Sequence, residues 1–220
     1  MSGNFHKKFE FLPNCRKVPL VFSIIDQEKT EFDVVGFMVR EGKVRIIGGK
    51  WRSRVITFPD EKYLRPTPDR VRETVFNWLG QDLTGKYCLD LFAGSGAMGF
   101  EAASRGAERV VMVELSRRIM HQLEATRKKL DATQVELVQM DALAFIASDV
   151  RQYDVIFLDP PFQFNLLPEL LMRLPSHMTG DSLVYIENDH KFDLDEQWLV
   201  WRSGRAGKVC YHLLKLKKNG

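Results

Sequence analysis

From residue 86 onward, short apolar runs alternate with segments of helical character, and this alternation constrains the fold more than any other feature of the chain. The apolar runs, bounded by turn residues, predict buried strands. The expected strands are 87–92, 109–114, 135–140, 153–158 and 182–187, and the expected helices are 97–105, 116–130, 141–146 and 166–174. Strands that alternate with helices form a mostly parallel, doubly wound sheet. We therefore expect an α/β, Rossmann-like fold, finished by an antiparallel strand pair at 198–201 and 209–216.

Two further elements are expected upstream of this sheet. Basic and apolar residues alternate over 44–58 around Gly48-Gly49, which predicts a small β-hairpin with the glycines at a turn. A helix is expected to begin near Asp69, with that residue as its N-cap, and to end at Gly80. Ser116 and Asp141 are expected to cap later helices, because each stands directly before one.

The pattern also divides the chain. Residues 1–42 show no sustained periodicity, and we expect them to be an N-terminal extension of unknown role. Met38 lies just before the first patterned segment, so one hypothesis is that the protein properly starts there. A basic hairpin unit is expected over 43–64, followed by the main domain over 65–220.

The composition excludes several classes of protein. No apolar run approaches the roughly 18 residues of a membrane span, and the N-terminus lacks the apolar segment and cleavage site of a secreted chain. The three cysteines are odd in number and widely spaced, which indicates a reducing compartment. The histidines lack the spacing of metal ligands. We expect a cytoplasmic protein with no membrane association and no metal.

One turn carries the most specific chemical information. The run Asp159-Pro160-Pro161-Phe162 follows the strand 153–158, and the sheet ladder must stop because neither proline has an N–H to donate. A carboxylate, a backbone carbonyl and an aromatic ring are then displayed at the edge where open α/β sheets bind ligands. The two acceptors fit the two N–H donors of an exocyclic amine, and the ring fits a planar base. Asp159, Pro160, Pro161 and Phe162 are therefore the candidate catalytic residues; an ordinary strand-ending turn is the alternative.

A glycine-rich turn predicts a nucleotide site beside it. Gly94-Ser95-Gly96-Ala97-Met98-Gly99 matches G-x-G-x-x-G after a strand and at the start of a helix, where the pattern has meaning. Glu114 ends the next strand, where a carboxylate can accept both ribose hydroxyls of an adenosine. These features fit a nicotinamide dinucleotide and S-adenosylmethionine equally, because both contain adenosine.

Three further observations favour the methyl donor. Asp90 precedes the glycine turn, where its carboxylate suits the ammonium group of a methionine moiety and would repel a pyrophosphate. Asp141 ends the third strand and can accept the adenine amine. Hydride transfer has no use for the turn at 159–162. For Asp90 and Asp141 the alternative is strand-end solvation or helix capping.

The charge distribution predicts the partner. The net charge of +3 conceals ten Lys/Arg against four Asp/Glu over 40–72, six against none over 202–220, and eleven against twenty over 73–201. A basic rim around an acidic body is typical of a protein that grips a polyanion; solvated basic tails are the alternative. Trp51 would stack on a base or pack internally. The candidate nucleic-acid contacts are Lys43, Arg45, Lys50, Trp51, Arg52, Arg54, Arg70, Arg72, Arg205 and Lys208.

These motifs resemble a known family. Residues 89–96 resemble motif I of the amino methyltransferases, and 159–162 resemble their motif IV. The segments 45–49, 64–67 and 69–79 closely resemble the RsmD family of bacterial 16S ribosomal RNA guanine-N2 methyltransferases. The resemblance covers about residues 43–216.

The resemblance implies a class I methyltransferase fold, S-adenosylmethionine as cofactor, and one guanine of 16S rRNA within the 30S ribosomal subunit as target. A monomer is expected. Within the implied cofactor set, the glycine turn lines the methionine end, Glu114 takes the ribose, Asp141 and Ala142 border the adenine, and the Arg65-Pro66-Thr67 turn closes over the donor. The implied cofactor-binding residues are Arg65, Pro66, Thr67, Asp90, Phe92, Ala93, Gly94, Ser95, Gly96, Glu114, Leu115, Asp141, Ala142 and Asp159.

Other functions stay open at this point. An adenine-N6 or cytosine-N4 DNA methyltransferase could use the same acceptor pair, although such enzymes usually carry a sizeable target-recognition region. A glutamine-N5 protein methyltransferase fits the basic rim less well. A catalytically silent RNA-binding ribosome assembly factor could keep the fold, but the intact glycine and Asp-Pro-Pro-Phe turns argue against it. A nicotinamide dehydrogenase is the remaining alternative.

Overall fold

The structure is a computed structural model of the 220-residue chain, and it describes residues 41–60, 64–188 and 194–217. All of them belong to the second of two compact units, Met38–Gly220. The hypothesis of a start at Met38 and most of the expected extension over 1–42 lie outside the described residues. Glu41 opens the first strand, inside the segment predicted as an extension.

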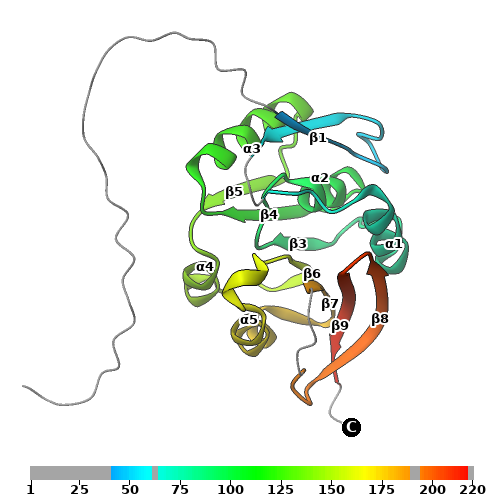
Figure 1. The fold of residues 1–220 in the computed structure, drawn as a ribbon, viewed down its shortest axis with the longest axis vertical. Helices are drawn as coiled ribbons and strands as arrows, with labels where there is room; N and C mark the ends of the chain where they lie inside the picture. The colour runs from blue at the N-terminus through cyan, green and yellow to red at the C-terminus, as the bar shows by residue number, and fades with distance from the viewer. Residues whose placement is uncertain (1–40, 61–63, 189–193, 218–220) are drawn as a thin grey trace, which may run out of the picture. The chain divides into compact units, whose positions relative to one another are not determined.

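Two sheets are present in the described part of the chain (Figure 1). A hairpin pairs β1 (Glu41–Arg45) with β2 (Val55–Pro59) in antiparallel fashion. The main sheet has seven strands in the order β5-β4-β3-β6-β7-β9-β8. The first five in that order are parallel, and β9 is antiparallel to both of its neighbours, which confirms the predicted fold class. The bounds are β3 Tyr87–Asp90, β4 Arg109–Glu114, β5 Val135–Gln139, β6 Tyr153–Leu158, β7 Met178–Asn188, β8 Trp198–Ala206 and β9 Val209–Leu216.

Helices cover both faces of the main sheet. One core cluster unites the sheet with α1, α2, α3 and the hairpin, and a second unites it with α4 and α5. Successive strand residues alternate between the clusters, as Cys88 and Leu89 do, because side chains in a strand point to opposite faces. The bounds are α1 Asp69–Leu79, α2 Ala97–Ser104, α3 Arg117–Leu130, α4 Ala142–Ser148 and α5 Leu167–Arg173, with short 3₁₀ helices at Phe162–Phe164 and Leu174–His177.

Helix ends follow the predicted chemistry in three of four cases. Ser116 accepts a hydrogen bond from the Ile119 amide at 3.4 Å, and Asp141 caps α4 in the same way. Gly80 ends α1, as predicted. The prediction that Asp69 is the N-cap of α1 is wrong, because Pro68 holds that position. Asp69 is the first helical residue, and its carboxylate is used in an ion pair.

The hairpin packs on the body of the domain through its connection, residues 46–54. The Lys50 amide donates to the Ser104 carbonyl at the end of α2, at 2.7 Å. A Cβ on Gly49 would lie 1.8 Å from that carbonyl oxygen, so only glycine permits this approach. The predicted turn at Gly48-Gly49 is therefore also the contact that fixes the hairpin to α2.

The antiparallel pair at the end of the sheet is longer than predicted. Strand β8 runs on to Ala206, where a loop was expected after residue 201, and a short turn at Gly207 and Lys208 joins it to β9. Arg202 and Arg205 therefore lie on a strand. This strand is the edge of the sheet, and exposed cations there discourage further strand pairing.

Candidate active site at the carboxyl ends of the parallel strands

The strand order creates a switch point between β3 and β6. The chain passes from β3 to β4 and β5 on one side, and then returns to add β6 and β7 on the other. The Leu91 amide donates to the Phe157 carbonyl at 3.1 Å, which joins the carboxyl ends of the two central strands. Open α/β sheets bind ligands at such a point. The predicted glycine turn follows β3 and the Asp-Pro-Pro-Phe turn follows β6, so both motifs lie at the switch point.

Asp90, at the end of β3, binds the start of the helix that follows the glycine turn. This carboxylate is 4% exposed and accepts a hydrogen bond from the Gly99 amide at 2.9 Å. Burial raises the pKa of Asp90 to about 7, against the opposing effect of that hydrogen bond. A Cβ on Gly99 would lie 2.7 Å from the Met112 Sδ, so this glycine allows α2 to pack closely on β4. Of the other predicted residues here, Phe92 and Gly94 are half-buried, while Ala93, Ser95 and Gly96 are buried.

Glu114, at the end of β4, forms a hydrogen bond with the same glycine turn. Its carboxylate accepts hydrogen bonds from the Gly94 amide at 3.0 Å and from the Ser116 amide at 2.8 Å. The predicted role of this carboxylate, at the end of the strand that follows the glycine turn, is to accept ribose hydroxyls. The next residue, Leu115, is 65% exposed. An apolar side chain held in solvent beside this carboxylate suits the face of a nucleobase.

The end of β5 adds a further carboxylate. Asp141 is exposed and accepts from the Ala144 amide at 3.0 Å, which makes it the N-cap of α4, while Ala142 is buried behind it. The structure thus gives Asp141 the capping role that the sequence left as an alternative, and its role toward adenine stays a prediction.

The Asp-Pro-Pro-Phe turn carries the predicted acceptors, with Pro160 buried and Pro161 exposed. The Pro161 carbonyl accepts a hydrogen bond from the Phe164 amide at 3.1 Å. No backbone amide in the described part of the chain donates to the Pro160 carbonyl. The Phe162 ring is partly exposed at the start of a 3₁₀ turn. Asp159 is also partly exposed; burial, followed by the nearby Glu187 and Asp90 carboxylates, raises its pKa well above the ordinary value.

Glu187 belongs to this site and was not predicted. It is the penultimate residue of β7, next to the end of β6, and it accepts hydrogen bonds from the Tyr185 hydroxyl at 2.5 Å and from the Thr67 hydroxyl at 3.1 Å. The sequence held a signal for it, because an acid also ends strands β3 and β4 and follows β6 directly. Thr67 is buried, and with the half-buried Pro66 and the exposed Arg65 it joins the predicted donor-covering turn to this edge.

Eight of the ten predicted nucleic-acid contacts are exposed. They lie on the hairpin and its connection, on the first turn of α1 and at the β8–β9 turn: Lys43, Arg45, Lys50, Arg52, Arg54, Arg70, Arg205 and Lys208. Trp51 is 3% exposed and packs in the core, so the prediction that it stacks on a base is wrong and the packing alternative holds.

The prediction that Arg72 contacts RNA is also wrong. Its side chain is fully buried, because residue 72 faces the body of the domain and not solvent. One terminal nitrogen donates to Glu101 at 3.2 Å, and the other donates to Asp69 at 2.6 Å. The second nitrogen also donates to the Arg45 carbonyl, and Nε donates to the Thr67 carbonyl at 3.1 Å. Arg72 therefore holds the hairpin and the Thr67 turn to α1.

Glu101, on α2, is the centre of this buried network. Its Oε1 accepts from the Gly48 amide and from Arg105 Nε, both at 2.8 Å. Its Oε2 accepts from the Ile47 amide at 2.8 Å and from Arg72. We call these groups the Glu101 cluster. It fixes the connection that carries Lys50, Arg52 and Arg54 relative to the glycine turn at the other end of α2.

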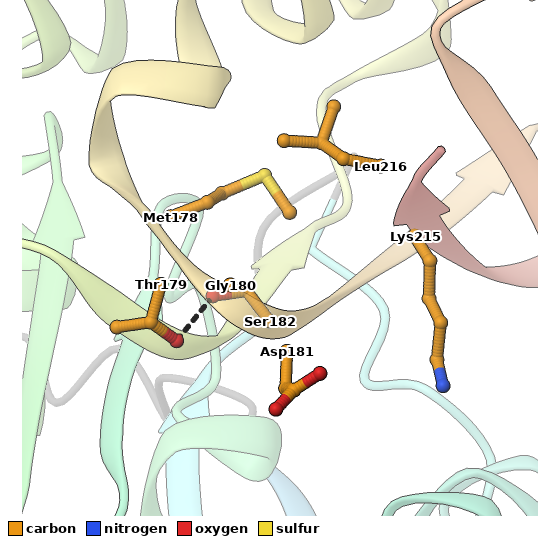
Figure 2. A pocket seen from close by; sticks show the side chains of 7 residues that line it. All are labelled: Met178, Thr179, Gly180, Asp181, Ser182, Lys215 and Leu216. Atoms are coloured by element: carbon orange, nitrogen blue, oxygen red, sulfur yellow. Dashed lines mark hydrogen bonds between the residues drawn. The ribbon is translucent and has the colours of Figure 1, made fainter. Parts of the chain in front are cut away.

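A shallow cavity of about 110 Å³ lies elsewhere (Figure 2). It is formed where β7 begins and β9 ends, and the Thr179 and Ser182 hydroxyls are 2.9 Å apart in its wall. Because β7 is parallel to β6, its beginning lies at the amino edge of the sheet, away from the predicted residues. Within the described ranges, no cluster of three or more His, Cys, Asp or Glu could hold a metal, and no helix there could cross a bilayer.

Comparison with known proteins identifies the family. The family model described as conserved hypothetical protein 95 matches residues 44–215. Ribosomal RNA small subunit methyltransferase D of Escherichia coli strain K12 is 39% identical over 184 residues, which cover 81% of this chain and 93% of that relative. A solved structure from Escherichia coli, named as the methyltransferase yhhF, is 37% identical with a TM-score of 0.74, covering 81% of this chain and 100% of that one.

An RNA methyltransferase from Salinibacter ruber, solved in complex with S-adenosyl-L-homocysteine, shares the fold at a TM-score of 0.55 and 20% identity. The match covers 70% of this chain and 95% of that one. With the family model spanning most of the chain and a relative aligned over nearly its own full length, the chain belongs to the RsmD family of ribosomal RNA small subunit methyltransferases.

Proposed function

We propose that the protein transfers a methyl group from S-adenosylmethionine to the exocyclic N2 amine of a guanine in the 16S rRNA of the 30S subunit. The observation that carries this proposal is the meeting of the glycine turn and the Asp-Pro-Pro-Phe turn at the switch point between β3 and β6. Family membership supports the rRNA substrate, and the S-adenosyl-L-homocysteine complex of the structurally similar RNA methyltransferase from Salinibacter ruber supports the donor.

The chemistry of the donor site fits an adenosine-containing cation. Glu114 would take the ribose, Leu115 and Asp141 would border the adenine, and the turn from Gly94 to Gly96 would line the methionine end. The carboxyl groups of Asp90 and Asp159 lie at the same edge and favour a positive ligand. When bound, S-adenosylmethionine supplies an electrophilic methyl group on a cationic sulfur.

The amine is prepared by the turn after β6. The N2 amine of guanine is a poor nucleophile, because its lone pair is delocalised into the ring. In this proposal the Asp159 carboxylate and the Pro160 carbonyl accept the two amine hydrogens, which turns the lone pair out of the ring plane. Phe162 holds the face of the base. Positioning of this kind can supply up to about 7–11 kcal/mol of the barrier reduction.

The RNA must be held while its base is unstacked. Unstacking one base costs a few kcal/mol, and the eight exposed cations offset this cost through phosphate contacts. The hairpin unit is the main contributor in this proposal, because it supplies five of the eight and its connection is fixed by the Glu101 cluster.

One assay tests the function. The full chain is incubated with methyl-labelled donor and, separately, bare 16S rRNA, 30S particles and DNA, and the modified nucleoside is identified by mass spectrometry. The proposal predicts N2-methylguanosine in rRNA. Label in adenine or cytosine of DNA would favour the DNA methyltransferase alternative, and absence of label in all three substrates would contradict the enzyme assignment.

A further inference from the structure

Three carboxyl groups gather where β3, β6 and β7 end, and we call Asp90, Asp159 and Glu187 the acid cluster. The register pairs Asp90 with Phe157, and Phe157 with Tyr185. Two residues after Phe157 comes Asp159, directly beyond the end of β6, and two residues after Tyr185 comes Glu187 in β7. Because strand side chains alternate, both lie on the same side of the sheet as the residues just paired. The register thus brings all three carboxyl groups to the edge beneath the Thr67 turn.

No cation of the described residues neutralises this cluster. None of its three carboxylates forms an ion pair with a Lys or Arg in that part of the chain. The groups that face Glu187 are hydroxyls and acids: Tyr185 on its own strand, Tyr211 opposite it on β9, Thr67, and Asp159. Glu187 is therefore a buried acid whose neighbours can share a proton but cannot balance a negative charge.

Resting on the proposed function, we propose that Asp159 and Glu187 form a proton-exchanging pair. Binding of the cationic donor releases a proton from the pair, and the pair takes up the proton that the methylated amine must lose. Glu187 contacts neither reactant in this proposal; it is a positioning residue that acts through Asp159.

The electrostatics of the cluster support this exchange. Burial raises the pKa of Glu187 above its ordinary value, and burial with the Glu187 and Asp90 charges raises that of Asp159. Neighbouring like charges at one buried edge disfavour ionisation of all three groups, so the cluster titrates as a unit and keeps its protons to higher pH than isolated carboxyl groups do when no cation is present. A sulfonium beside the cluster favours the ionised form.

The proton that the methylated amine must lose is accepted by this pair. The amine nitrogen uses its lone pair to bond the methyl carbon, and the electron pair of the broken carbon–sulfur bond stays on sulfur, which becomes neutral. The nitrogen then carries the positive charge and loses an N–H proton to Asp159. The reaction removes the positive charge from the sulfur and adds a proton to Asp159, so the net charge of the buried site is the same before and after methyl transfer.

Calorimetry measures the exchange without turnover. The full chain is titrated near pH 7 with S-adenosylmethionine and with S-adenosylhomocysteine, each in buffers of different ionisation enthalpy, which gives the protons released per ligand bound. The neutral-sulfur product is the matched ligand control. We expect the donor to release about half a proton or more beyond the product.

The substitution Glu187→Gln isolates the role of this residue. Its amide carbonyl can still accept from Tyr185 and Thr67, so the turn should keep its position. The extra proton release should fall by at least half. Because one acid is removed from beside Asp159, the acidic limb of the pH–rate profile should move to lower pH, by about one unit. Glu136→Gln, at the amino end of β5, is the control and should change neither quantity.

The outcomes separate the two proposals. Equal proton release for donor and product in the unsubstituted protein would overturn this inference while leaving the proposed function intact. Unchanged release and an unchanged pH limb in the Glu187→Gln protein, whatever its affinity, would overturn the role of Glu187. Failure of the unsubstituted protein to bind the donor at all would overturn the proposed function, and this inference with it.

Discussion

The substitution Glu101→Gln should destabilise the domain strongly, although it changes almost no volume. Each carboxylate oxygen accepts two hydrogen bonds, one from an amide of the hairpin connection and one from a buried arginine. An amide in either orientation points its NH₂ group at two donors. One backbone amide and one arginine N–H then lose their acceptor, and Arg72, which is fully buried, keeps a charge with less compensation.

The magnitude follows from these contacts. Removing one partner of a buried ion pair costs about 3–5 kcal/mol, and an unsatisfied buried donor costs about 1–3 kcal/mol. Because the effects overlap, we expect a loss of about 4 kcal/mol in the free energy of unfolding. For a domain of this size that corresponds to a Tm lower by roughly 8–16 °C. Urea and thermal unfolding followed by circular dichroism measure both quantities.

A matched exposed acid provides the control. Glu124→Gln on α3 removes a carboxylate that pairs with Arg127 at 2.8 Å in a partly exposed position. This change should cost less than about 1 kcal/mol. If Glu101→Gln were as mild as Glu124→Gln, the argument that the Glu101 cluster fixes the hairpin to α2 would be refuted.

Three further predictions concern the ligands and pH. Glu114→Ala should raise the donor dissociation constant by about tenfold or more in calorimetry, because a charge-assisted hydrogen bond contributes about 1.5–3 kcal/mol; an unchanged constant would contradict the ribose assignment. Arg52→Ala with Arg54→Ala should lower the slope of log affinity for single-stranded RNA against log salt by about 1.4, measured by filter binding, and an unchanged slope would remove these residues from the interface. The raised pKa of Asp90, about 7 in the folded protein, means that the folded state binds more protons than the unfolded state and that stability is lost as pH rises from about 4 to 7. Asp90→Asn should therefore gain about 2–4 kcal/mol relative to the unsubstituted protein between those pH values in urea unfolding, and a pH-independent difference would contradict the shift.

The parts of the site at strand ends could be predicted from the sequence. Apolar runs locate the strands, and Glu114 and Asp159 follow from where those runs stop. Asp90 lies inside the expected strand 87–92, whereas in the structure it is the last residue of β3. The same rule applied to the run before Glu187 would have found that residue too. The adjacency of β3 and β6 could not be read from the sequence directly, because strand order depends on contacts between residues far apart in the chain.

The errors came from side chains whose environment is set by distant residues. Arg72 is a charged residue near the start of a helix, so the local sequence suggests that it faces solvent. Its buried partner Glu101 is 29 residues away on another helix, and the local sequence gives no sign of it. Trp51 lies among basic residues, yet the contact of Gly49 with α2 turns it into the core. Local patterns record charge and polarity; they do not record which face of an element another element will cover.

The most direct test of the central claim is a comparison of the Asp159→Ala protein with the unsubstituted protein. Donor binding is measured by calorimetry, and methyl transfer is measured in single turnover on the RNA substrate that the labelling assay identifies. With Asp159 holding the amine, the donor should still bind, and the loss in donor affinity should be much smaller than the loss in transfer rate, which should fall by about 100-fold or more. A transfer rate that stays the same in the Asp159→Ala protein would contradict the account.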